Sequence, residues 1–239
     1  MLASGADALE QLFTLHGAAS FDKQVYLRAQ FGQAGWAFDL ESGVLAFRRP
    51  HEPLLQLQAQ VLGTESAQAG TWLWGWANTQ SRIPERLLSI ARQMQQLGEM
   101  LRVPALLAPE LELSESVSGD RLSLIAVGVA RAAAHFRAAY PGGALFLIIK
   151  DGRYPRRIAR PVRRVARLFP AFLARYTVAD ARAALKAYLH FYRLQVVEDG
   201  AHVIGEHRWR DTLSGQERIE RVSATFAGQQ LASWEYQPA

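Results

Sequence analysis

The stretch GTWLWGWANT, residues 70–79, places tryptophans at every second position: Trp72, Trp74 and Trp76. Residues two apart on a β-strand project from the same face, so this spacing predicts a strand with three indoles on one side. Each indole can bury about 150–250 Å², and an exposed face of three would be costly in water. We therefore interpret the tryptophans as core rather than as a ligand-stacking surface. Gly75, on the opposite side, would let the helix expected at 119–140 pack closely.

The residues around this strand predict an antiparallel meander packed with helices. Alternating polar and apolar residues, typical of strands with one wet face, occur at 35–40, 44–49 and 53–63, with a hairpin turn at 41–43. Helical and buried-strand patterns account for the rest of the first 150 residues. We expect two short helices within 5–31, the second capped by Ser20, a helix from Pro84 to Arg102, a strand at 105–114, a helix at 119–140 and a strand at 144–150.

The composition changes after Lys150, where two prolines and a run of arginines begin. We take this change as a boundary between a tryptophan-rich domain at 1–152 and a smaller C-terminal unit at 153–239. The second unit is expected to begin with helices and to end in an antiparallel sheet. Its expected elements are a helix at 161–175, a helix to about Leu194 capped by Thr177 with Asp180, and strands at 195–199, 202–210, 216–226 and 230–236. The predicted fold class is α+β.

The bulk composition excludes several classes of protein. The chain of 239 residues contains no cysteine, so disulfides, thiol catalysis and cysteine-ligated metals are excluded. The N-terminus lacks the basic start of a signal peptide, and the longest apolar run, 122–134, is shorter than the ~20 residues that span a bilayer. We expect a cytoplasmic protein.

The positive charge comes from one block. Residues 152–179 carry eight arginines and no acid, whereas 19 basic residues face 22 acidic ones elsewhere. Within a helix starting near Pro161, the spacing i, i+3, i+4, i+7 predicts a cationic stripe opposite an apolar one. The candidate partner-binding residues are Arg156, Arg157, Arg160, Arg163, Arg164 and Arg167.

Arginine matches both carboxylate and phosphate groups, so several partners come into question besides a plain solvated helix face. An acidic protein surface is the preferred partner. Nucleic acid ranks lower because Phe169 and Phe172 lie on the apolar side, away from the arginines. A membrane surface ranks lowest because Pro170 shortens the amphipathic helix.

Motifs for catalysis, nucleotide cofactors and metals are missing from the sequence. None of the six histidines has a metal-ligand spacing, and neither a nucleophile elbow nor a phosphate-binding glycine loop occurs. The order of elements in the C-terminal unit resembles the cone-shaped NTF2-like folds, which can hold a small-molecule pocket. That resemblance makes its aromatic and histidine side chains pocket candidates, although they are equally ordinary core residues: Tyr188, His190, Tyr192, Trp209 and Trp234.

The tryptophan stretch, with LQAQVLGTES before it and QLGEM after it, also resembles an uncharacterised bacterial domain family with a T-W-x-W-x-W-A-N signature. The similarity extends from about residue 20 to Tyr154. It implies a compact α+β domain of bacterial origin and assigns no catalytic residue. The favoured function is therefore non-catalytic binding of a partner, in an accessory or immunity-type role, through the arginine-rich helix. The alternatives are an enzyme or small-molecule binder that uses the C-terminal pocket, and a nucleic-acid-binding protein.

Overall fold

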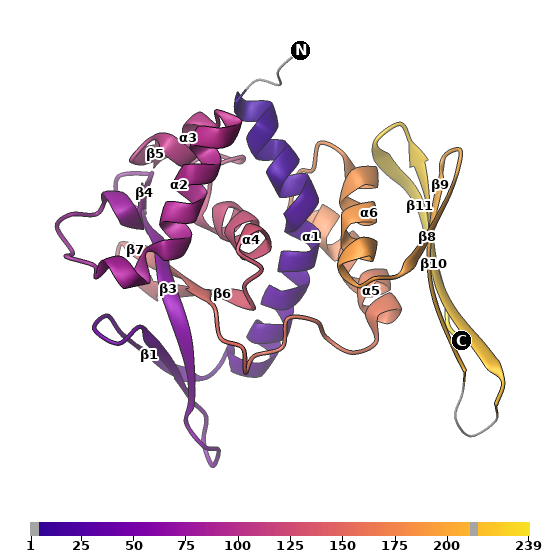
Figure 1. The fold of residues 1–239 in the computed structure, drawn as a ribbon, viewed down its shortest axis with the longest axis horizontal. Helices are drawn as coiled ribbons and strands as arrows, with labels where there is room; N and C mark the ends of the chain where they lie inside the picture. The colour runs from indigo at the N-terminus through magenta and orange to yellow at the C-terminus, as the bar shows by residue number, and fades with distance from the viewer. Residues whose placement is uncertain (1–4, 211–214) are drawn as a thin grey trace. The chain divides into compact units, whose positions relative to one another are not determined.

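The computed structural model describes residues 5–210 and 215–239 (Figure 1). Its helices and antiparallel sheets make an α+β fold, as predicted. The chain divides into two compact units. Unit 1 contains the residues up to Phe13 and residues 23–156, and unit 2 contains residues 14–22 and 157–239. A long N-terminal helix therefore contributes its middle turns to unit 2.

Unit 1 is built on an antiparallel sheet with seven strands among the described residues. Its strand order is β1-β2-β3-β4-β5, with β7 also paired to β3 and β6 paired to β7. The predicted hairpin, the long third strand and the tryptophan strand all lie in this meander. The strands are β1 Gly35–Asp39, β2 Val44–Arg48, β3 Leu55–Ser66, β4 Thr71–Trp74, β5 Glu110–Glu112, β6 Ala134–Tyr140 and β7 Gly143–Ile149.

Trp72 and Trp74 are both 0 % exposed, so the core interpretation is correct for them. Their rings meet edge to face with centroids 5.4 Å apart, and Trp74 Nε1 donates to Ala105 O at 3.1 Å. Strand β4 ends at Trp74, however, and the half-buried Trp76 lies in a 3-10 turn, η1 Gly75–Ala77. The prediction of three indoles on one strand was therefore wrong at its last member.

We expected Gly75 to allow close packing of the helix at 119–140. The glycine that permits close packing here is Gly63 instead. A Cβ on Gly63 would lie 2.4 Å from Cζ2 of Trp72, so the indole occupies the space that a side chain would need. Gly75 instead faces Leu88 and the backbone of Leu62. The small residue that the tryptophan core requires is thus on the neighbouring strand, where it receives the ring.

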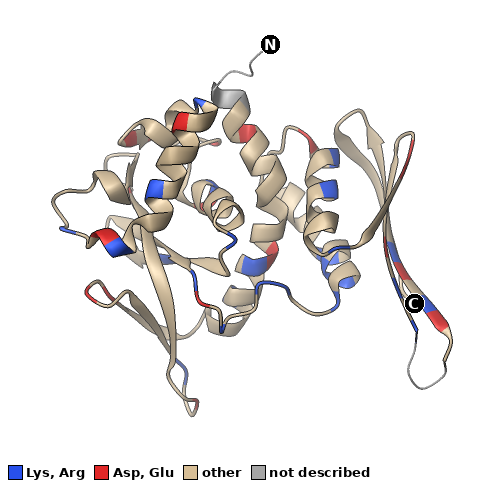
Figure 2. Cartoon of the chain, in the orientation of Figure 1, with Lys and Arg blue, Asp and Glu red and all other residues tan. Residues whose placement is uncertain are grey.

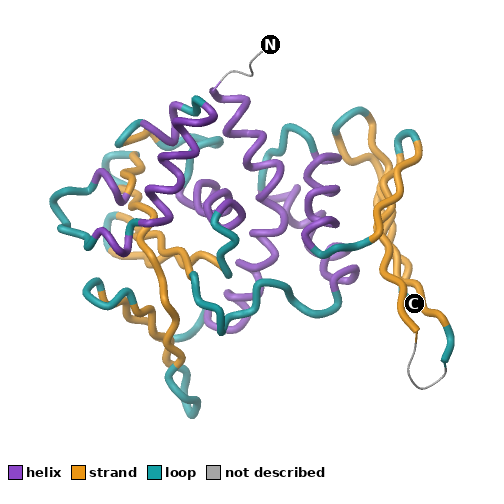
Figure 3. Tube along the Cα trace, viewed as in Figure 1, coloured by secondary structure: helices purple, strands orange, loops and turns teal. Residues whose placement is uncertain are grey.

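The helices of unit 1 differ from the expected ones in three places. Residues 5–31 form a single helix (Figure 3), because one glycine inside a helix costs only about 1 kcal/mol and buried side chains such as Phe13 and Leu27 continue on both sides of it. Ser20 is a buried mid-helix residue rather than a cap. The helices are α1 Gly5–Phe31, η2 Glu85–Leu87, α2 Ser89–Leu101, α3 Pro104–Leu107 and α4 Gly119–Val129.

The second half of the helix expected at 119–140 is strand β6. Helix α4 ends at Val129, Arg131 adopts a positive φ of 50°, and β6 then pairs with β7 from Ala134↔Ile149 to Tyr140↔Gly143. Runs of small apolar residues fit a buried strand as well as a helix, so periodicity alone does not separate the two. In the segment 105–114, which was expected to be one strand, the first residues belong to the short helix α3 and only Glu110–Glu112 form a strand, β5.

Unit 2 contains two helices, α5 Pro161–Arg175 and α6 Ala181–Phe191, and a four-stranded antiparallel sheet among its described residues. Asp180, not Thr177, caps α6, since its side chain accepts from Ala183 N at 2.8 Å. The sheet order is β11-β10-β9-β8, and the strands lie close to their predicted positions. They are β8 Gln195–Asp199, β9 His202–Arg210, β10 Glu217–Ala227 and β11 Gln230–Gln237. The expected turn at 211–215 falls mostly outside the described residues.

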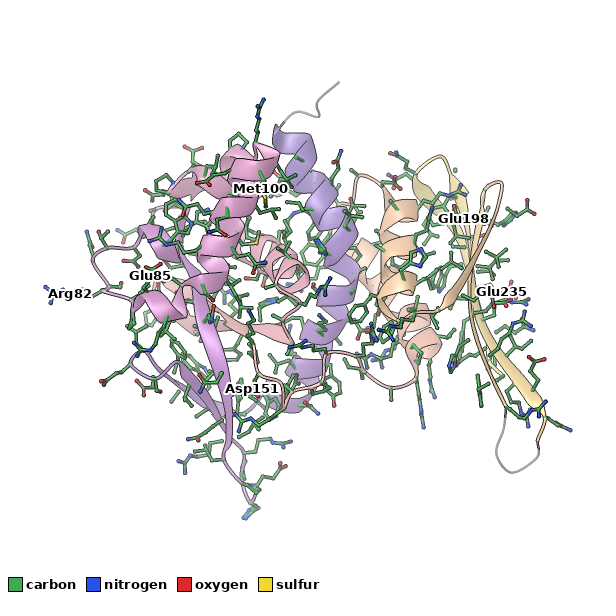
Figure 4. All side chains as sticks on the ribbon, in the orientation of Figure 1. Arg82, Glu85, Met100, Asp151, Glu198 and Glu235 are labelled. Atoms are coloured by element: carbon green, nitrogen blue, oxygen red, sulfur yellow. The ribbon has the colours of Figure 1, made fainter. Side chains whose placement is uncertain are left out.

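The two faces of this sheet follow from its register. Val222 pairs with Tyr236 on one side and with Gly205 on the other, and its neighbour Ala224 pairs with Trp234 and Val203. These residues project toward α5 and α6, and we call this side the inner face. The opposite, outer face carries Glu235, which points away from the helices (Figure 4). None of the helices in the described part of the chain is long and apolar enough to cross a membrane.

Candidate anion-binding groove

Helix α5 places the arginine stripe of the sequence beside the C-terminal sheet. Its apolar side is buried, as predicted, through Val162, Val165, Leu168, Phe169 and Phe172. Phe172 also contacts the ring of Phe21 from α1, with centroids 5.8 Å apart. Because these contacts fix the rotation of the helix, its arginine side faces outward along the sheet, where Figure 2 shows the basic positions of unit 2.

A groove of about 570 Å³ runs between this arginine side and the last strand. Strand β11 contributes Trp234 and Tyr236 from the inner face, and the Nε1 atom of Trp234 donates to Ala166 O of α5 at 3.0 Å. The groove is therefore lined by cationic side chains on one side and aromatic rings on the other. Its lining residues are Ala159, Arg160, Arg163, Arg164, Ala166, Arg167, Trp234 and Tyr236. We call it the arginine groove.

Three of these arginines are available to a ligand. Arg160, Arg163 and Arg167 are exposed, and among the described residues no carboxylate lies within ion-pair distance of them. Three like charges on adjacent turns of one helix repel each other, and an anion in the groove would relieve that repulsion. The groove is therefore an electrostatic site that favours negative charge.

Arg164 has a different role, because it is held by a buried carboxylate. Asp22 of α1 is 0 % exposed and its Oδ1 accepts from Arg164 Nε at 2.6 Å and from Nη2. The other oxygen, Oδ2, accepts from the hydroxyl of Tyr188 at 2.6 Å and from that of Tyr192 at 2.5 Å. Both oxygens are thus satisfied, which is what a buried carboxylate requires. All four residues belong to unit 2.

In this cluster Tyr188 and Tyr192 stay protonated and Arg164 stays charged near neutral pH. Burial raises the pKa of Tyr188 and of Tyr192, and the negative charge of Asp22 raises them further. Burial lowers the pKa of Arg164, but the hydrogen bonds and charge of Asp22 outweigh it, so the net shift is upward. The guanidinium of Arg164 is therefore a fixed cation in the wall of the groove.

The aromatic side of the groove continues along the hairpin β9–β10. His207 and Trp209 alternate with Gly205 on β9 and so lie on the inner face, where their rings stack with centroids 5.1 Å apart. This part of the sheet extends past the ends of α5 and α6 (Figure 3), and Trp209 is 36 % exposed. Tyr236 is fixed from the same side by its hydroxyl, which donates to Glu220 Oε1 at 2.5 Å and thereby raises the pKa of Tyr236.

The predicted partner-binding arginines are only partly brought together. Arg160, Arg163, Arg164 and Arg167 line the groove, whereas Arg157 donates its Nε to Phe191 O at 2.9 Å. Arg156 belongs to unit 1. The patch expected to continue from the linker into the helix therefore consists of the four residues on and beside α5.

The pocket candidates of the C-terminal unit lie in separate places. His190 is exposed on α6, Tyr188 and Tyr192 are buried against Asp22, and Trp209 lies on the exposed hairpin. Trp234 alone of the five lines the arginine groove. In the described residues these side chains do not surround a common cavity.

The sequence interpretation missed Asp22 and Tyr236. Asp22 lies 142 residues before its arginine partner, so no local pattern indicated it. Tyr236 could have been found, because it is two residues from Trp234 on a predicted strand and must share its face.

Besides the groove of unit 2, a smaller pocket of about 320 Å³ lies in unit 1, between the β1–β2 hairpin and the main sheet. Its lining is mostly apolar and includes Trp36, Ile83 and Tyr140, with Asn78 as one of the few polar groups. Asn78 is committed to the turn, since its Oδ1 accepts from Ser81 N at 3.1 Å. Among the described residues, no cluster of histidine and acidic side chains could hold a metal ion.

Comparison with protein families gives one match, to the Family of unknown function (DUF6882), over residues 10–151. The search of curated proteins and the search of solved structures found no match. The family match covers 142 of the 239 residues and includes the tryptophan strand and the whole sheet of unit 1. It ends before α5, so the arginine groove lies outside it. The chain belongs to the family of unknown function DUF6882.

Proposed function

We propose that this chain is a binding protein rather than an enzyme, and that its arginine groove takes a polyanionic partner. The observation that carries the proposal is the set of three exposed arginines, Arg160, Arg163 and Arg167, aligned in one groove without acidic partners among the described residues. Guanidinium groups bind carboxylates and phosphates through paired N–H donors. Both an acidic protein and a nucleic acid supply such groups in series.

The geometry supports binding more than catalysis. The buried carboxylates of unit 2 are paired within the protein, as at Asp22 and at Glu206, whose pKa the hydrogen bond from Arg208 lowers. A general base needs a proton acceptor that faces the ligand, and the lining of the groove contains no carboxylate and no histidine. The groove is lined by guanidinium groups and aromatic rings, which are groups that bind ligands.

The test is a direct binding measurement with two labelled polyanions, dodecaglutamate and a twelve-residue oligothymidylate. Fluorescence anisotropy of each probe would be titrated with wild-type protein and with Arg163→Glu/Arg167→Glu. We expect at least one probe to bind, to weaken as salt rises from about 50 to about 200 mM, and to lose about tenfold or more in affinity to the charge reversal.

The matched control is Arg48→Glu/Arg86→Glu, which makes the same change of charge at two exposed arginines of unit 1. It should bind within about twofold of the wild type once the general field is screened at the higher salt. If neither probe binds, or if the two double variants weaken binding equally, the groove is not the binding site and the proposal fails.

A further inference from the structure

We propose that the polyanion is a single-stranded nucleic acid, whose phosphates contact the arginines of α5 while its bases stack on the aromatic inner face of the C-terminal sheet. This inference rests on the proposed function and specifies the partner of the same groove. It is carried by the juxtaposition of a cationic stripe with a series of rings: Trp234, Tyr236, His207 and Trp209.

The rings form successive rows along the sheet. Strand register places Trp234 beside Ala224, Tyr236 beside Val222, His207 beside Glu220 and Trp209 beside Arg218. These partners are two residues apart on β10, so neighbouring rows are separated by about 6.8 Å at the antiparallel rise of ~3.4 Å per residue. The rows begin in the arginine groove and continue onto the part of the hairpin that α5 and α6 leave uncovered.

Exposed rings favour a single strand over a duplex. Successive bases in a duplex are about 3.4 Å apart along each strand and are stacked on each other, so their faces are closed to protein side chains. Trp234 and Tyr236 lie on β11, and the stacked pair of His207 and Trp209 lies on β9, on the other side of β10. Such rings suit bases that have been separated from their neighbours, as single-strand-binding proteins hold them on aromatic side chains.

The cations follow a comparable repeat beside the rings. Arg163 and Arg167 are four residues apart on α5, which gives a step of about 6 Å along the helix axis, and Arg160 directly precedes the helix. An extended strand can therefore place a phosphate near each arginine while its bases turn toward the sheet. Arg164, held by Asp22, adds a cation that cannot move away from the wall.

An acidic peptide would use only half of this surface. Its carboxylates would pair with the arginines, but acidic side chains carry no aromatic ring to cover the exposed ring of Trp209, which is stacked on His207 with an interplanar angle of 26°. Bases have two flat faces and stack on such rings whatever their sequence. The inner face of the hairpin also carries Arg218 beside Trp209, and the carboxylate of Glu220 on the same face accepts from the hydroxyl of Tyr236.

The experiment compares four labelled probes on the full chain: dodecathymidylate, dodecauridylate, a twelve-base-pair duplex and dodecaglutamate. We expect the two single strands to bind at least about tenfold more tightly than the other two at the same salt. With about three phosphates neutralised, the affinity for a single strand should fall roughly 20-fold between about 50 and about 200 mM salt. A clear preference between the two single strands would report on the 2′-hydroxyl and the thymine methyl group together, since the probes differ in both.

The deciding variant is Trp209→Ala, at an exposed position where the fold loses little packing. It should weaken oligonucleotide binding by about 5- to 150-fold, the range for removal of one stacking ring, and leave dodecaglutamate binding unchanged. Trp36→Ala is the matched control, since Trp36 is an exposed tryptophan of unit 1 at 43 %, and it should bind as the wild type does. Circular dichroism would verify that both variants keep the fold.

Two results would overturn the inference. One is oligonucleotide binding by Trp209→Ala with wild-type affinity, and the other is dodecaglutamate or duplex binding as tight as that of the single strands. If the Arg163→Glu/Arg167→Glu variant still loses dodecaglutamate binding in that case, the proposed function stands and only the assignment of the partner fails.

Discussion

Replacing Asp22 by asparagine would test whether the buried cluster of unit 2 holds the groove in place. The substitution keeps the shape of the side chain but removes its charge and turns one acceptor oxygen into an NH₂ donor. That NH₂ must face either the guanidinium of Arg164 or the hydroxyls of Tyr188 and Tyr192, all of which donate to Asp22 in the wild type. An asparagine at this position therefore cannot satisfy all of these donors.

The expected loss is large because both the carboxylate and its donors are buried. Removing one partner of a buried ion pair costs about 3–5 kcal/mol, and a hydrogen bond to a charged group contributes about 1.5–3 kcal/mol. We take about 3–5 kcal/mol as the loss in the free energy of unfolding, because asparagine keeps some of the bonds. At about 2–4 °C per kcal/mol for a chain of this size, the midpoint of thermal unfolding should fall by roughly 6–20 °C.

Urea unfolding followed by circular dichroism would measure the free energy, and hydrogen exchange of peptides from α5 and α6 would locate the loss in unit 2. The control is Asp199→Asn on the exposed end of β8, where the change should stay within about 0.5 kcal/mol. A loss below about 1 kcal/mol for Asp22→Asn, or no faster exchange in α5 and α6, would refute the argument that this carboxylate fixes Arg164.

Two further changes follow from local contacts. Gly63→Ala should lower the free energy of unfolding by about 1–3 kcal/mol, because the new Cβ would lie 2.4 Å from the ring of Trp72. The control Gly152→Ala, with nothing within 4 Å of its Cβ, should leave the free energy of unfolding unchanged in the same urea titration. Burial raises the pKa of Tyr188 and Tyr192 above the ordinary 10.0. The folded state then keeps two protons that the unfolded state releases above that pH, so stability should fall by about 1.4 kcal/mol per pH unit for each tyrosine; a flat profile above pH ~10.5 would contradict this.

The fold was predictable wherever a segment's local pattern agreed with its burial. Helix α5 lies at its predicted bounds because Pro161 marks the start and an apolar stripe continues to Arg175. The strands of unit 2 were predictable for the same reason, since their alternation matches a sheet with one covered face. In unit 1 the run of small residues at 130–134 had no such pattern. Residues 134–140 form strand β6 by pairing with the next strand, β7, and the composition of the run does not show that pairing.

The site was less predictable because its two halves come from different segments. The arginine stripe was visible as a helical spacing, but the aromatic side of the groove comes from β11, about seventy residues along the chain from α5. The sequence reasoning ranked nucleic acid low because Phe169 and Phe172 are on the buried side of α5, and both are indeed buried. The rings that line the groove are Trp234 and Tyr236 instead, and only the register of the sheet brings them there.

The family match ends before the residues that line the groove, but Asp22, which lies inside the matched region, belongs to the unit that carries the groove. DUF6882 covers residues 10–151, so Asp22 lies inside the matched region while Arg164, Tyr188 and Tyr192 lie beyond it. Residues 157–239 taken without residues 14–22 would retain two tyrosine hydroxyls and a guanidinium with no carboxylate to receive them, and a half-buried guanidinium without a partner is costly. The unit that carries the groove therefore depends on residues 14–22 of α1, which lie inside the family region, so we expect the proposed binding to need those residues as well as residues 157–239.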